Sequence, residues 1–173
     1  MRMFGTKGAA LPDQVRSALG LRRGEQAITW APTTDEVWVV ATTFRVVAVS
    51  ADGDVRVDRP WHEVDAGQWD SDTWTLSVTW VDGRWAAQWT FPERVEGRFP
   101  EAFRERVQAT VLLSEPLGLV GPGTSGRVVL RKDLAEQRVF VQEVLGRRTR
   151  QDDPEVRAEV SRLRAFLEEQ AGL

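Results

Sequence analysis

The chain contains no cysteine, which excludes disulfides, thiolate metal ligands and a cysteine nucleophile. Its only histidine is His62, so a zinc site, which usually takes more than one His or Cys, is short of ligands. No apolar run approaches the roughly 18 residues of a membrane span, and the first residues lack the apolar core of a signal peptide. We therefore expect a soluble, cytoplasmic protein.

Lysine is almost missing too, with Lys7 and Lys132 as the only examples among 23 basic residues. The net charge of -3 argues against broad, non-specific binding to nucleic acid. At 173 residues the chain is long enough for one well-buried domain with appendages. Its 42% hydrophobic and 28% charged residues are typical of an ordinary globular protein.

The hydrophobic pattern changes period along the chain. Residues 11–21 have a four-residue spacing and predict a short helix, whereas residues 25–91 contain β-branched and aromatic runs with a period of two. Asp52-Gly53 and Asp82-Gly83 each have the composition of a two-residue hairpin loop, because glycine readily takes a positive φ. We therefore expect several short antiparallel strands over this region.

The second hairpin can be checked by its register. With Asp82-Gly83 as the loop, one face of the hairpin becomes wholly apolar, and a slip of one residue would destroy the match. The residues on this face are Trp74, Leu76, Val78, Trp80, Trp85, Ala87, Trp89 and Phe91. We therefore assign four of the eight tryptophans, Trp74, Trp80, Trp85 and Trp89, to the core.

Helical spacing returns after residue 98. Phe99, Phe103, Val107 and Val111 share one face of a helix that we expect to reach Leu113. Beyond a connector at residues 121–126 we expect strands within 127–145 and a last helix at 153–170 with Asp153 as its N-cap. The expected fold class is α+β, a small antiparallel barrel or bent pair of sheets capped by the first of these helices.

Three regions follow from this division. Residues 1–22 form an arm with a short helix, 23–115 the β-rich domain, and 116–173 an extension that packs on the same domain. The apolar stripe of the last helix permits packing within the chain or a homodimer.

Two stretches carry a resemblance to a known family. The stretch VWVVATTFRVVAVSADG, with Thr42 closing one strand and Arg45 opening the next, resembles bacterial pleckstrin-homology-like and GRAM-like domains. The stretch VDRPWHEVDAG, with Pro60, Trp61 and Val64, resembles the segment that follows there. The whole chain is similar to an uncharacterised family common in high-GC Gram-positive (actinobacterial) bacteria. The resemblance implies a PH-like fold over residues 22–115 and leaves the function open.

The candidates for chemistry are few. His62 lies near Glu63, Asp65, Asp70 and Asp72, but strand alternation scatters these acids over two faces, and no nucleophile accompanies them. The stretch GPGTSGRV nearly matches a phosphate-binding loop, yet Arg127 and Val128 replace the required lysine and hydroxyl. We therefore expect no enzyme, no metal and no cofactor.

The remaining interpretation is a protein-interaction or adaptor module. The candidate protein contacts are Trp38, Trp61, His62 and Trp69. The loop APTTDE has two acids and no base where PH-like domains that bind phosphoinositides carry cations, which argues against a lipid headgroup as ligand.

Two alternatives remain open. The first is a nucleic-acid or ribosome-associated accessory protein, and its candidate contacts are Arg131, Lys132, Arg147, Arg148 and Arg150. The second is a small enzyme centred on His62 and Asp65.

Overall fold

The structure is a computed structural model that describes residues 10–93 and 98–173. It begins with α1 (Asp13–Leu19), which confirms the helix expected over residues 11–21. Gly20 ends this helix in the left-handed conformation, at φ 49°. The helix lies on the outer face of the first sheet, where Val15 and Leu19 pack into one apolar cluster with Val47. The first nine residues of the expected arm lie outside the described residues.

The first sheet is a meander of four antiparallel strands. They are β1 (Ala27–Pro32), β2 (Val37–Thr42), β3 (Arg45–Ser50) and β4 (Val55–Pro60), paired in chain order. The β3–β4 hairpin contains Asp52-Gly53 as expected, but the Ser50 N–H donates to the Asp54 carbonyl, so the loop has one residue more than predicted. Gly53 takes the positive φ, 90°, that this tight loop requires.

A single turn, η1 (Trp61–Glu63), leads from the first sheet into the second. The second sheet consists of β5 (Val64–Asp70), β6 (Thr75–Trp80) and β7 (Ala87–Thr90), again paired in chain order. Leu76 pairs with Trp89 and Val78 with Ala87, which confirms the predicted register of the second hairpin.

The end of this hairpin differs from the prediction. The Gly83 N–H donates to the Trp80 carbonyl, and the chain leaves the ladder there and rejoins it only at Ala87. The expectation that Trp85 lies on the apolar face, opposite Trp80, is therefore wrong, and the Trp85 side chain is 95% exposed. Trp80 and Trp89 are buried as predicted, while Trp74 lies half-buried in a turn at φ 53°.

The amphipathic helix is shorter than expected. It is α2 (Arg98–Thr110), and the next residues form strand β8 (Val111–Pro116), which pairs with β9 (Gly126–Lys132). Phe99 and Phe103 face the core as predicted, whereas Val111 belongs to the strand and is exposed. The C-terminal sheet therefore begins at Val111, before the expected boundary after residue 115.

The C-terminal third forms its own layered unit. Strand β10 (Val139–Leu145) completes a sheet of order β10-β9-β8, and α3 (Pro154–Ala171) covers it. The Asp153 side chain accepts the Glu155 N–H, as the predicted N-cap requires. The predicted apolar stripe is buried against β9 and β10 of this chain: Val156, Val160, Leu163 and Leu167. The extension therefore packs on its own sheet, and a homodimer would need another surface.

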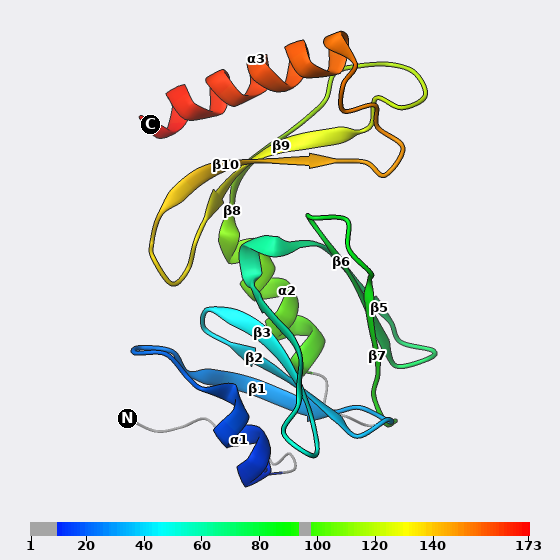
Figure 1. The fold of residues 1–173 in the computed structure, drawn as a ribbon, viewed down its shortest axis with the longest axis vertical. Coiled ribbons are helices and arrows are strands. Elements are labelled where there is room, and N and C mark those ends of the chain that lie inside the picture. Colours follow the sequence, from blue (N-terminus) through cyan, green and yellow to red (C-terminus); the bar gives the residue numbers. More distant parts are fainter. Residues whose placement is uncertain (1–9, 94–97) are drawn as a thin grey trace.

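The fold is α+β with three antiparallel sheets that do not close into a barrel. Helix α2 lies between the first two sheets, and the C-terminal sheet with α3 stands beyond its end (Figure 1). Within the described residues, no helix is long and apolar enough to cross a membrane.

Candidate functional site: a groove between strand β5 and helix α2

The residues that carry the family resemblance lie in a buried polar network. Arg45 is 4% exposed and donates from Nε to Glu25 Oε1 at 2.9 Å and from Nη1 to Asp58 Oδ2 at 2.5 Å. Its Nη2 also donates to the carbonyl of Leu19, at the end of α1. The Thr42 hydroxyl donates to Glu25 and accepts the Arg45 N–H. This network joins α1 to the first sheet and so stabilises the fold.

Among the candidate contacts, Trp61 and His62 turn inward. Trp61 is 0% exposed, and its Nε1 donates to the Thr42 carbonyl, so it is a core residue and not a surface contact. The His62 ring packs edge-on against Phe140 of β10, with Nδ1 3.9 Å from Asp133 Oδ2. Burial lowers the pKa of His62 below its ordinary value of 6.5, and the charge of Asp133 only partly opposes this. His62 thus lies at the junction of the two halves of the fold. The N-terminal half comprises the first two sheets with α1 and α2, and the C-terminal half comprises the third sheet with α3.

The acids near His62 do not converge. Asp65 binds Arg127 of β9, and Asp70 accepts the backbone N–H groups of Asp72 and Thr73. Within residues 10–93 and 98–173, no group of three potential metal-ligating side chains is present.

The basic segment is only partly a surface. Arg131 is 1% exposed and donates to the Val64 carbonyl, the Thr110 hydroxyl and Gln142, so it bridges the two halves and cannot contact a nucleic acid. Burial, with a contribution from the charge of Arg127, lowers the pKa of Arg131 to about 10, which still leaves it charged at neutral pH. Lys132 is half-buried, and the exposed members of the predicted set are Arg147, Arg148 and Arg150.

The connector at residues 121–126 is hydrogen-bonded to the end of this basic stretch. The Arg150 N–H donates to the Gly123 carbonyl, and the Gly146 N–H donates to the Ser125 carbonyl. The backbone of this near-match to a phosphate loop therefore bonds to its own chain.

One hollow lies between the β1–β2 and β3–β4 loops. It measures about 550 Å³, and its charged lining residues are Asp35, Glu36, Asp52 and Arg56. Three acids against one base make this hollow a poor place for an anion.

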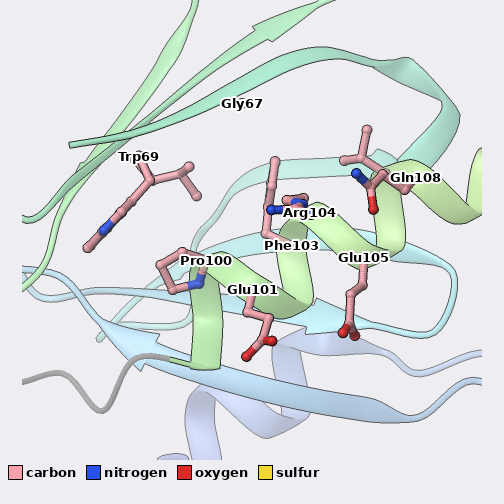
Figure 2. Close-up of a pocket in the computed structure, with 10 residues that line it drawn as sticks. Gly67, Trp69, Pro100, Glu101, Phe103, Arg104, Glu105 and Gln108 are labelled. Atoms are coloured by element: carbon pink, nitrogen blue, oxygen red, sulfur yellow. The ribbon is translucent and has the colours of Figure 1, made fainter. Parts of the chain in front are cut away.

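A second hollow, of about 560 Å³, runs between β5 and α2. Strand β5 is an edge strand of its sheet, because among the described residues it pairs with β6 alone. The apolar lining of this hollow consists of Trp69, Leu76, Pro100, Phe103 and Val107. Figure 2 shows Trp69 and Pro100 at one end, Gln108 at the other, and Gly67 above the middle of the helix. We call this hollow the β5–α2 groove.

Gly67 sets the distance between the two walls of the groove. A Cβ atom at this position would lie 2.6 Å from Phe103 Cε1, closer than any stable contact. Only glycine therefore lets β5 approach α2 so tightly, which is the reason a glycine occurs inside this strand.

The charges of the groove come from α2. Arg104, Glu101 and Glu105 line it, together with Gln108. Figure 2 shows Arg104 over the middle of the helix, with Glu101 and Glu105 pointing away from β5. In the part of the chain that the structure describes, Arg104 has no ion-pair or hydrogen-bond partner. The groove thus offers an apolar floor, a strand edge, and one arginine and two glutamates among its lining residues.

Of the four predicted protein contacts, only Trp69 belongs to the groove. Trp38 is half-buried on the opposite face of the first sheet, beside α1. Sequence reasoning missed Gly67, Arg104 and the groove itself. A glycine inside an otherwise regular strand signals the close approach of another backbone or side chain and was the one available clue.

Comparisons with protein-family models, with curated proteins and with solved structures found no match for this chain.

Proposed function

We propose that the protein is a non-enzymatic, PH-like interaction module that binds an extended segment of a partner protein in the β5–α2 groove. The segment would pair with the free edge of β5 as an additional strand and place alternate side chains into the groove. Main-chain hydrogen bonds would supply affinity, and the groove side chains would supply selectivity.

The PH-like assignment draws on element order. Strands β1 to β7 form two antiparallel sheets and one amphipathic helix follows them, which agrees with the expected bent pair of sheets capped by a helix. The observation that carries the interaction proposal is the unpaired edge of β5 beside an apolar groove. Sheet edges left open this way are normally shielded or used for pairing.

Selection of peptides from a phage-displayed random library on the full chain would test this proposal. Selected peptides, added to the isotope-labelled protein, should shift the backbone amide NMR signals of residues 66–70 and of the groove face of α2. Val107→Arg should weaken binding by tenfold or more, because it places a charge on the apolar floor. Ala109→Arg, an exposed change on the same helix, is the matched control.

The proposal fails if no peptide is enriched, or if the shifts appear at Arg147, Arg148 and Arg150 and leave β5 unchanged.

A further inference from the structure

We propose that two copies of the chain pair through the outer edges of β8, so that their C-terminal sheets join into one continuous antiparallel sheet. This surface is separate from the β5–α2 groove and has no part in the proposed function. Because the apolar stripe of α3 is already buried against its own sheet, the edge of β8 is the surface that a homodimer would use.

Strand β8 is an edge strand with an exposed run of apolar side chains. Among the described residues it pairs with β9 alone. Val111, Leu112 and Leu113 follow one another and are 38–46% exposed, and Ser114 is exposed as well. Neighbouring residues of a strand point to opposite faces, so this part of β8 is uncovered on both faces of the sheet.

The helix of the C-terminal half leaves this edge open. Helix α3 packs on β9 and β10, and its apolar stripe meets Val128 and Leu130 of β9. The apolar clusters of the described residues include none of Val111, Leu112 and Leu113. A run of three exposed apolar residues is a feature of interaction surfaces. An additional strand beside β8 would cover them.

Strand β8 also lacks the residues that normally keep sheet edges apart. Charged side chains and proline on an edge strand prevent pairing between molecules. Strand β4, at the edge of the first sheet, carries Arg56, Asp58 and Arg59. Strand β8 has no charge before Glu115 and no proline before Pro116. Its first four residues are therefore open to a further strand.

The strand that best fits this edge is a second β8. An antiparallel pair of identical strands is related by a two-fold axis, so the same residues meet on both copies. With the axis at Leu113, the two Leu113 side chains lie opposite each other, and Leu112 lies opposite Ser114 of the other copy. The two Glu115 residues are then four positions apart, about 13 Å along the strand, which exceeds the Debye length of about 8 Å at physiological salt. The pairing thus joins two uncharged edges without opposing like charges.

Sedimentation velocity on the full chain, between about 10 and 1000 μM, would detect this dimer. A six-residue edge is about 20 Å long and buries less than the roughly 800 Å² per copy of a standard interface. We therefore expect a dissociation constant on the order of 100 μM. Over the same range, the amide NMR signals of residues 111–115 should shift, while those of β10, the opposite edge of the sheet, stay in place.

Substitutions on the edge identify the surface. Leu113→Lys should weaken the dimer at least tenfold, because two lysines would then face each other across the axis. Leu112→Lys, at the neighbouring exposed position, should act in the same direction. Val55→Lys, an equally exposed apolar position on the edge strand β4, is the matched control and should leave the dimer unchanged. Circular dichroism melts of the three variants confirm that they are folded.

Three results would overturn the proposal. The first is a wild-type chain that stays monomeric up to about 1000 μM. The second is a dimer that both lysine substitutions on β8 leave as stable as before. The third is a dimer whose amide shifts are confined to another sheet edge.

Discussion

Arg45 joins three parts of the N-terminal half through one side chain. Its guanidinium meets Glu25 before β1, Asp58 on β4 and the last carbonyls of α1. A cation at a helix C-terminus also interacts favourably with the helix dipole. Because both Arg45 and Glu25 are buried, removal of one partner leaves an uncompensated charge inside the protein.

Glu25→Gln should therefore lower the free energy of unfolding by about 3 kcal/mol at pH 7, measured by urea denaturation. Burial alone would raise the pKa of Glu25, but the hydrogen bonds and the charge of Arg45 outweigh it, and the pKa lies below 4.5. A lowered carboxyl pKa stabilises the folded state fully above the unfolded pKa, and this stabilisation is lost as the pH falls through the folded pKa. The gap between wild type and variant should thus narrow below about pH 4.5.

Glu169→Gln, an exposed change on α3, is the control and should leave the unfolding midpoint in place. Equal stability of wild type and the E25Q variant at pH 7 would show that the network contributes nothing to folding.

At the scale of elements, the contact between β5 and α2 depends on Gly67. The Phe103 ring that it touches is itself held at 5.3 Å from Trp61 in an edge-on arrangement, so it has little room to move. A methyl group at position 67 must therefore push the strand away from the helix.

Gly67→Ala should lower the free energy of unfolding by about 1–3 kcal/mol, a cost typical of overpacking. Combining it with Phe103→Leu should cost less than the sum of the two single changes, because the smaller side chain frees the space. Thermal melts of the four proteins in this cycle give the coupling. Gln68→Ala, at the next exposed position, should have little effect, and strict additivity in the cycle would contradict the contact.

The elements also show what sequence patterns can and cannot predict. The register of β6 and β7 followed from the Asp82-Gly83 loop and from alternation, because one strand face is buried and a slip would expose it. Val111-Leu112-Leu113 fits a helical and an extended pattern equally well, and pairing with β9, far along the chain, decides for the strand. The ion pair of Glu25 with Arg45 joins residues that are 20 positions apart, so no local sequence pattern predicts it.

The candidate site was less predictable than the fold. Trp61 looked like an exposed aromatic residue in a polar stretch, but the turn at Pro60 directs it into the core. Arg131 looked like part of a basic surface, yet the junction of two units that are distant in sequence encloses it. Both errors arise because the hydrophobic periodicity of a sequence does not predict tertiary contacts between distant segments.

The whole molecule has two main apolar cores with a polar junction between them. One core fills the space between the first two sheets and α2, and the other lies between α3 and the C-terminal sheet. The junction is made largely of hydrogen bonds, from Arg131 to Val64, from Gln142 to His62 and from Arg127 to Asp65. The hydrogen bonds made by the charged Arg131 and Arg127 contribute about 1.5–3 kcal/mol each, which is still far less than a buried apolar core.

We therefore expect the two halves to unfold in separate local events. Leu163→Ala removes a buried side chain of the C-terminal core and should cost about 2–5 kcal/mol there. In native-state hydrogen exchange, the amides of β9, β10 and α3 should lose protection, while those of β2 and β3 change little. Val78→Ala, in the other core, should show the reverse pattern, and Phe166→Ala, exposed on α3, is the control. A uniform loss of protection across the chain in both variants would mean that the junction couples the halves into one cooperative unit.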